Sequence, residues 1–210
     1  MGADYLEWLK AGAQATGVDI SSASLERAKL RCEMAGYTPD LRVSDAERLP
    51  FPDNTFDIVY SYGVMHHSPD TQQCIREAWR VLKPGGALRI MLYHHPSLTG
   101  FMLWLRYGWL RGKSLRQSVH DHLESPGTKS YTQEEARAML QGFDKIEFRQ
   151  AFSPGDLLLN EPSAPLSRIG VPHRLAPVSA VSRPQVGSKV GTVPFDLRAQ
   201  NGGGVSLLTE

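Results

Sequence analysis

A short apolar run over residues 13–19, which ends in the acidic residue Asp19, constrains this chain most. A helix-like stretch over residues 5–11 comes directly before it. Ser21 or Ser22 can cap a second helix, whose apolar residues then recur at helical spacing. A strand between two helices, so close to the first residue, predicts the second half of a βαβ unit. The first strand of that unit is missing from this part of the sequence.

Strand-like and helix-like segments alternate over the next hundred residues. Further strands are predicted at residues 41–43, 56–60, 87–93 and 145–152. Helices are predicted over residues 70–82 and 132–140, and Lys83-Pro84-Gly85-Gly86 ends the first of them. This alternation predicts an α/β fold, with a doubly wound, mostly parallel sheet covered by helices on both faces.

The chain divides into a domain over residues 1–160 and a tail over residues 161–210. A helical insertion at 96–130 interrupts the domain after a strand. The tail is rich in Pro, Ser, Gly, Val and Arg and lacks periodicity, so we predict that it does not fold well alone. Residues 205–208 are the one strand candidate within it.

The composition excludes several classes of protein. A formal net charge of +1 argues against a dedicated nucleic-acid binder. The two cysteines, Cys32 and Cys74, match no disulfide framework and no metal site, and we predict that both are buried apolar residues. The chain opens with no signal peptide and contains no long apolar run, so the expected location is cytoplasmic.

Two acidic residues follow predicted strands, where ligands bind to open α/β sheets. Asp19 can accept hydrogen bonds from the hydroxyls of an adenosine ribose, or it can instead cap the next helix. Asp45, with Ala46 beside it, can accept from an adenine amino group, or it can simply begin a turn.

The strand over residues 56–60 leads into a loop of small and polar residues at the same edge. Ser61 and Gly63 are candidate cofactor-binding residues there. The adjacent His66 and His67 could contact a substrate or serve as a base near neutral pH. The alternative is that one of them packs and hydrogen-bonds locally.

Within the insertion, residues 101–105 and 107–110 are apolar on nearly every side, and the basic residues Arg106, Arg111, Lys113 and Arg116 lie close by in the sequence. Trp104 and Tyr107 suggest binding of a large apolar or lipid-like acceptor, or contact with a membrane surface through residues 98–116. The simpler expectation is a lid helix whose apolar face packs on the core.

From Gly2 to about Phe152 the chain resembles the class I S-adenosylmethionine-dependent methyltransferases, in particular the small-molecule group called methyltransferase type 11. The resemblance rests on the order and spacing of four motifs: Val18-Asp19-Ile20-Ser21, Asp45-Ala46 with Leu49-Pro50-Phe51, Phe56-Asp57-Ile58-Val59 with His66-His67, and Leu82-Lys83-Pro84-Gly85-Gly86.

The resemblance implies a Rossmann-like, seven-stranded sheet with an antiparallel last strand. It implies S-adenosyl-L-methionine as cofactor, with Asp19 and Ile20 at its ribose and Asp45 and Ala46 at its adenine. Only Gly2 remains to match the final glycine of the family's glycine turn. Without the first strand, its two neighbours would lose a partner, so we expect the complete protein to be longer.

Methyl transfer to a small-molecule or lipid-like acceptor by direct displacement is therefore the predicted function. One alternative is a non-catalytic remnant or fragment of the same fold. Another is an NAD-dependent oxidoreductase, because Asp19 would suit that ribose equally well. Against the oxidoreductase, no tyrosine in the sequence has a lysine four positions later.

Overall fold

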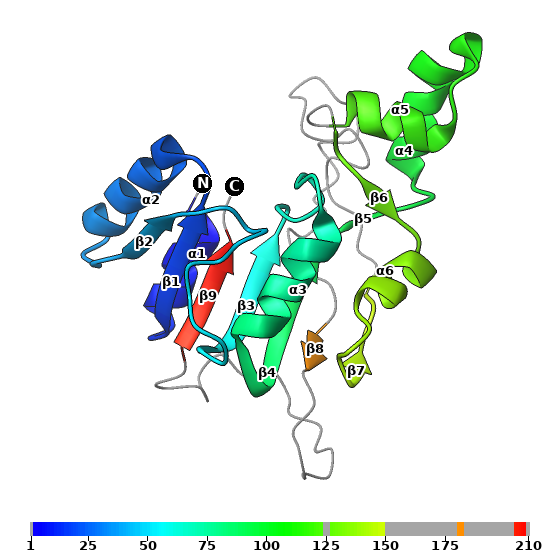
Figure 1. Ribbon diagram of the computed structural model, residues 1–210. Coiled ribbons are helices and arrows are strands. Elements are labelled where there is room, and N and C mark those ends of the chain that lie inside the picture. Colours follow the sequence, from blue (N-terminus) through cyan, green and yellow to red (C-terminus); the bar gives the residue numbers. More distant parts are fainter. Residues whose placement is uncertain (1, 124–126, 150–179, 183–203, 209–210) are drawn as a thin grey trace.

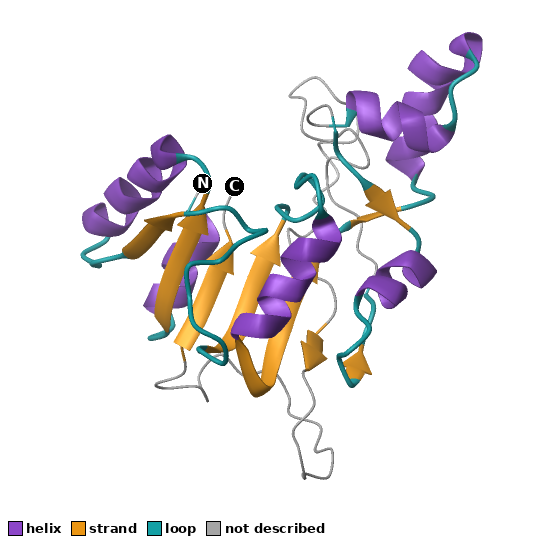
Figure 2. Ribbon diagram, in the orientation of Figure 1, coloured by secondary structure: helices purple, strands orange, loops and turns teal. Residues whose placement is uncertain are grey.

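A seven-stranded sheet in the order β2-β1-β9-β3-β4-β8-β7 runs through the protein (Figures 1 and 2). The structure is a computed structural model, and it describes residues 2–123, 127–149, 180–182 and 204–208. The strands of the sheet are β1 (Gln14–Asp19), β2 (Asp40–Val43), β3 (Phe56–Tyr62), β4 (Leu82–Met91), β7 (Lys145–Ile146), β8 (Ala180–Ser182) and β9 (Gly204–Leu208).

Five neighbouring strands, from β2 to β4, run parallel, and β8 runs antiparallel to both β4 and β7. The covering helices are α1 (Ala3–Lys10), α2 (Ser22–Met34), α3 (Thr71–Val81) and α6 (Gln133–Met139). The predicted α/β fold with a mostly parallel sheet is confirmed. The antiparallel strand is β8 and not, as predicted, the last strand, because β9 runs parallel to both of its neighbours.

Alternate residues of β3 separate the two halves of the core. Val59 packs in one buried cluster with Ile75 of α3, whereas Ile58 packs in another with Tyr5 and Trp8 of α1. Because side chains alternate across a strand, α1 and α3 cover opposite faces of the sheet. This is the doubly wound arrangement that the sequence predicts.

The centre of the sheet is filled by the last described strand of the chain. β9 pairs in parallel with β1, from Gln14 opposite Gly204 to Val18 opposite Leu208, and with β3 on its other side. The expectation that β1 and β3 would lack a partner is therefore wrong. In Figure 1 the red β9 lies between the blue β1 and the cyan β3.

Two segments of the predicted tail, β8 and β9, thus belong to the sheet, and the strand expected at residues 205–208 is confirmed. The rest of the tail lies outside the described residues. The strand predicted over 145–152 is confirmed only as β7, and residues 150–152 of it also lie outside them.

Local predictions hold at several other positions. Cys32 and Cys74 are both buried and free. Thr132 and Glu135 form the predicted capping box of α6. The predicted end of the helix before Lys83-Pro84-Gly85-Gly86 is confirmed, because α3 ends at Val81, but the predicted start of the next strand at Ala87 is wrong, because β4 already begins at Leu82. Gly86 permits this, since a Cβ there would lie 2.9 Å from the Lys83 carbonyl oxygen.

The insertion forms a separate lid beyond the end of β4. Its elements are β5 (Tyr93–His94), α4 (Leu98–Leu103), the π-helical turn η1 (Trp104–Gly108), the 3-10 turn η2 (Trp109–Arg111), α5 (Leu115–His122) and β6 (Ser130–Tyr131). β5 and β6 pair in parallel as a narrow neck, and α4 and α5 stand out from the sheet beyond it (Figure 1).

Two glycines allow the lid helices to approach each other closely. A Cβ at Gly108 would lie 2.2 Å from the Ser118 hydroxyl, and one at Gly100 would lie 2.9 Å from a Val119 methyl. The lid therefore packs on itself through its small residues. The expectation that its large apolar residues face the core is wrong for Leu98, Phe101, Leu105, Trp109 and Leu110, which are all exposed.

No helix in the part of the chain that the structure describes is both long enough and apolar enough to cross a membrane.

The position of β9 predicts that a proline in it is costly. Ser206 pairs with Thr16 on one side and Val59 on the other, so Ser206→Pro removes a ladder hydrogen bond at the centre of the sheet. We expect it to lower the free energy of unfolding by about 3 kcal/mol or more. Ser22→Pro, at the first position of α2, is the matched control and should change it little. Thermal unfolding followed by circular dichroism measures both, and equal midpoints would contradict the central placement of β9.

Candidate functional site

Asp19 ends β1 at the carboxyl edge of the sheet and is buried. Its Oδ1 accepts a hydrogen bond from the Ser21 backbone N–H at 2.7 Å, and the Ser21 hydroxyl in turn accepts from the Ser24 N–H to cap α2. The helix-cap alternative for Asp19 is therefore wrong, because Ser21 is the cap. The Ser44 N–H donates to the Asp19 carbonyl, which brings the loop after β2 beside the tip of β1.

Gly2 and Ile20 flank this strand end. Gly2 adopts a left-handed conformation with φ of +66°, and a Cβ there would lie 2.6 Å from the Ala28 Cβ. Only glycine fits that position, because the start of α1 presses directly on α2. Ile20 is 73% exposed beside Asp19, so it presents an apolar surface to any ligand bound there.

The loop after β2 is folded around its own side chains. Asp45 Oδ1 accepts a hydrogen bond from the Glu47 N–H at 2.9 Å, which makes Asp45 a turn residue as well as a candidate ligand contact. Ala46 packs against the main core cluster, in which Leu49 and Phe51 are buried. The loop is thereby held with the Asp45 carboxylate exposed near the tip of β1.

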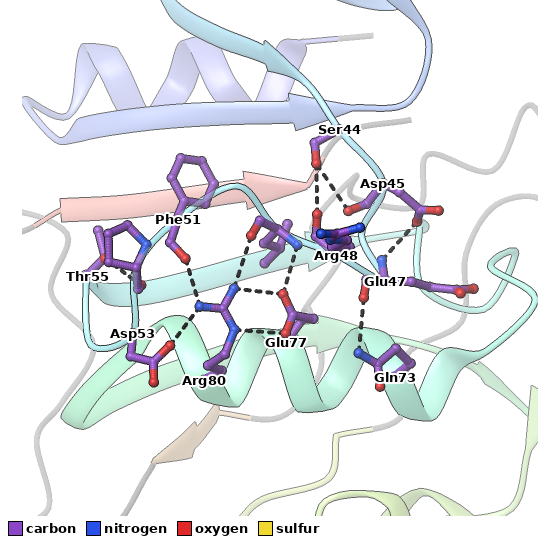
Figure 3. Close-up of polar contacts among 12 residues, drawn as sticks. Ser44, Asp45, Glu47, Arg48, Phe51, Asp53, Thr55, Gln73, Glu77 and Arg80 are labelled. Carbon is purple, nitrogen blue, oxygen red and sulfur yellow. Dashed lines mark hydrogen bonds and ion pairs between the residues drawn. The ribbon is translucent and has the colours of Figure 1, made fainter.

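Arg80 of α3 fixes this loop from below (Figure 3). Its guanidinium donates to the backbone carbonyls of Leu49 and Phe51 and to the carboxylates of Glu77 and Asp53, at 2.7 to 3.0 Å. Glu77 completes the network by accepting from the Leu49 N–H at 2.8 Å. The hydrogen bonds from Arg80 hold the pKa of the Glu77 carboxyl below its ordinary value.

The end of β3 brings a second group of predicted residues to the same edge. Ser61 is buried in the strand, and Gly63 follows it with φ of +80°. His66 is fully buried, with its ring 4.2 Å from the His67 ring and 4.4 Å from the Tyr93 ring. Burial, and next the neighbouring His67, lower the pKa of His66 to about 3, so it is neutral at physiological pH.

His67 differs from His66 in being only partly buried. Its Nδ1 lies 3.2 Å from the Thr128 hydroxyl, in the segment that returns from the lid to the domain. The next residue, Lys129, donates its N–H to the His66 carbonyl and its ammonium to the Ser68 and Pro69 carbonyls. The histidine loop and the returning segment therefore form one bonded unit.

Trp104 and Tyr107 lie in the lid, apart from the strand ends. The Trp104 indole N–H donates to the Lys113 carbonyl at 2.9 Å, and the Tyr107 ring packs 4.5 Å from the His122 ring. Both aromatic residues are held by contacts within the lid. The structure thus brings together Gly2, Asp19, Ile20, Asp45 and Ala46 at one strand tip and Ser61, Gly63, His66 and His67 at the next, while Trp104 and Tyr107 stay in the lid.

Sequence reasoning missed two residues that hold distant segments together, and the first of them, Arg80, lies beside the start of β3 rather than at this edge. Arg80 lies in a helix of ordinary charge pattern, and no spacing shows that it reaches two carbonyls about thirty residues earlier. The Tyr60 hydroxyl donates to Asp4 in the first turn of α1 at 2.9 Å, and burial, followed by Asp4, raises the pKa of Tyr60. Among the described residues, no group of three acidic, histidine or cysteine side chains could hold a metal ion.

Comparisons with known proteins agree with this geometry. A family model described as a methyltransferase domain matches residues 2–90. A 27-O-demethylrifamycin SV methyltransferase from Amycolatopsis mediterranei is 44% identical over 79 residues, which are 36% of this chain and 28% of that protein. Residues 2–90 therefore match a methyltransferase domain, of the class I S-adenosylmethionine-dependent kind that the sequence resembles.

Two further similarities support this assignment. A ubiquinone/menaquinone biosynthesis C-methyltransferase from Desulfotalea psychrophila is 46% identical over 74 residues, or 35% of this chain and 29% of that protein. The solved structure of a SAM-dependent methyltransferase from Methanosarcina mazei shares the fold, with a TM-score of 0.54 and 19% identity over 86% of this chain and 87% of that one. The family match favours the methyltransferase over the oxidoreductase alternative. The chain spans less than a third of the length of the two curated relatives, the rifamycin and the ubiquinone/menaquinone methyltransferases.

The Arg80 network predicts that this methyltransferase domain depends on a guanidinium at position 80. Arg80→Lys cannot reach two carbonyls and two carboxylates together, so it should lower the free energy of unfolding by about 1.5 to 3 kcal/mol. Arg76→Lys is the control, because Arg76 pairs with Asp70 on the surface at 3.5 Å and should cost less than about 1 kcal/mol. Urea unfolding measures both, and equal losses would show that the network does not hold the loop.

The buried His66 predicts a pH-dependent stability. Between its ordinary pKa of 6.5 and its folded pKa of about 3, the unfolded chain binds a proton that the folded chain does not. The free energy of unfolding should therefore fall as pH drops below 6.5, by up to about 1.4 kcal/mol per unit. His66→Phe should flatten this slope, whereas exchange of the exposed His122 for Gln should retain it. An unchanged slope in His66→Phe, in urea unfolding at a series of pH values, would exclude His66 as its source.

Proposed function

We propose that this protein transfers a methyl group from S-adenosylmethionine to a small-molecule or lipid-like acceptor that is largely apolar. The observation that carries the proposal is the pair of carboxylates of Asp19 and Asp45. They follow two adjacent parallel strands, β1 and β2, and the hydrogen bond from the Ser44 N–H to the Asp19 carbonyl holds the two strand ends together. Such a set of acceptors fits the two hydroxyls of a ribose and the amino group of an adenine. The exposed Ile20 between them suits one face of the base.

The residues of the chain would hold the reactants rather than supply the methyl group. When bound, the cofactor supplies an electrophilic methyl on a sulfonium, which an acceptor atom attacks directly. Asp19 and Asp45 would anchor its nucleoside, and the histidine loop would face the acceptor. Holding two reactants in line contributes up to about 7 to 11 kcal/mol in well-oriented systems.

His67 is the candidate base for an acceptor that must lose a proton. It is partly exposed, and the Thr128 hydroxyl at its Nδ1 orients the ring. His66 would contribute by packing beneath it, because a pKa of about 3 makes it a poor base at neutral pH. A hydroxyl or an acidic ring carbon is the kind of nucleophile that such a base activates.

The acceptor class is inferred from the lid and from the relatives. Trp104 and Tyr107 lie in the aromatic segment of the lid, which follows β4 and β5 along the chain. The relatives' names describe methylation of a rifamycin oxygen and of a quinone precursor. We therefore infer a large ring compound or a lipid-like acceptor, with Trp104 and Tyr107 on its apolar part.

Asp19 provides the direct test. Asp19→Asn keeps an oxygen for the Ser21 N–H but loses the charge, so affinity for S-adenosylmethionine should fall roughly 10- to 100-fold, as for a hydrogen bond to a charged group. Asp57→Asn is the control, because Asp57 pairs with Lys83 near the opposite end of β3. Isothermal titration calorimetry on the full chain measures both, and labelled methyl transfer to phenolic and quinol acceptors then tests turnover. Unaltered affinity in Asp19→Asn would overturn the proposed cofactor site.

A further inference from the structure

The outer face of the lid is an exposed apolar stripe. We define it by Leu98, Phe101, Leu105, Trp109 and Leu110, whose side chains are 48 to 93% exposed. The first four recur every three or four residues through α4, η1 and η2, so they follow one side of the helical segment. The rings of Phe101 and Trp109 lie 5.7 and 6.5 Å from the ring of Trp104 and link the stripe into one surface.

Only positive charges accompany this stripe. The sequence contains no Asp or Glu between Glu77 and Asp121. Of the four Lys and Arg residues from Arg106 to Arg116, two are neutralised, Lys113 by Asp121 at 2.7 Å and Arg116 by Glu135 at 2.9 Å. Arg106 and Arg111 alternate with the apolar residues along the chain and are exposed.

Neither of these two arginines forms an ion pair within the described residues. The Arg106 guanidinium lies 5.3 Å over the Tyr107 ring, and Arg111 donates to the Tyr107 carbonyl. Both contacts leave the positive charge uncompensated. The outer face of the lid therefore combines exposed apolar side chains with two free cations.

The inner side of the lid is already occupied. Gly100 and Gly108 bring α4 and η1 against α5, and the Trp104 indole N–H donates its hydrogen bond to the Lys113 carbonyl. The contacts within the lid therefore leave about half or more of each stripe side chain exposed. The helices α4 and α5 stand away from the sheet in Figure 1.

We propose that the outer face of the lid docks on the surface of an anionic lipid bilayer. Trp109, Phe101 and the leucines would enter the boundary between headgroups and acyl chains, as the apolar face of an interfacial helix does. Arg106 and Arg111 would lie at the lipid phosphates, since long cationic side chains extend toward the headgroups from an apolar surface. Charge complementarity selects an anionic membrane over a neutral one. This docking goes beyond methyl transfer and does not require it.

Vesicle flotation with the full chain tests the docking. The probes are vesicles of phosphatidylcholine alone and of phosphatidylcholine mixed with phosphatidylglycerol. We expect binding to the anionic vesicles that weakens with salt. Arg106→Gln with Arg111→Gln should weaken it about thirty-fold, since each cation at such a surface contributes about a factor of five. Trp109→Ser with Leu110→Ser should weaken binding at least ten-fold.

The matched control is Leu30→Ser with Met34→Ser, which removes two equally exposed apolar residues from α2. This variant should bind vesicles like the unaltered chain. Thermal unfolding of all variants shows that each is folded, and calorimetry with S-adenosylmethionine shows that the cofactor site is unchanged. Absence of vesicle binding by the unaltered chain, equal losses in the control, or self-association that Trp109→Ser with Leu110→Ser abolishes would each overturn the proposal.

Discussion

The pairing of backbone groups at the centre of a parallel sheet is the constraint on which this structure depends. β1 and β3 each need a hydrogen-bonded neighbour on both sides, because buried N–H and C=O groups without partners are costly. β9 meets that need for both strands at once. The carboxyl ends of β1 and β3, and with them both groups of site residues, hold their spacing only because a strand lies between them.

The site is divided between a fixed half and a half that adjoins the lid. On the β1 side, the Asp19 and Asp45 carboxylates each accept a hydrogen bond from a backbone N–H group, so they are oriented before any ligand binds. On the β3 side, the histidine loop is bonded to the segment that returns from the lid. A nucleoside would therefore meet a preorganised surface, which reduces the entropy lost on binding.

Local patterns predicted most of the elements and the edge of the sheet at which the candidate residues lie. The acid at the end of β1, the capping box of α6 and the alternation of strands and helices are short-range signals, and each was confirmed. The partner of β1 was not predictable in this way, because β9 lies almost two hundred residues away along the chain.

The two histidines and the lid show the same limit. The sequence does not distinguish two adjacent histidines in one loop, yet His66 is fully buried and His67 is not. The difference depends on contacts with residues distant in the chain, because His66 packs on Tyr93 and His67 lies beside Thr128. The sequence predicts that the apolar lid residues are buried in the core. It does not show that Gly100 and Gly108 make the internal contacts of the lid instead.

The neck of the lid has a consequence for how such a protein can change. β5 and β6 pair only through Tyr93 with Ser130 and His94 with Tyr131, so the chain leaves and re-enters the domain at adjacent points. An inserted segment with neighbouring ends can be lengthened, shortened or exchanged without altering the sheet beneath it. The acceptor-facing part can therefore diversify while the strand tips that would hold the nucleoside stay the same, and a chimaera that joins another insertion at these two strands is a route to a new specificity.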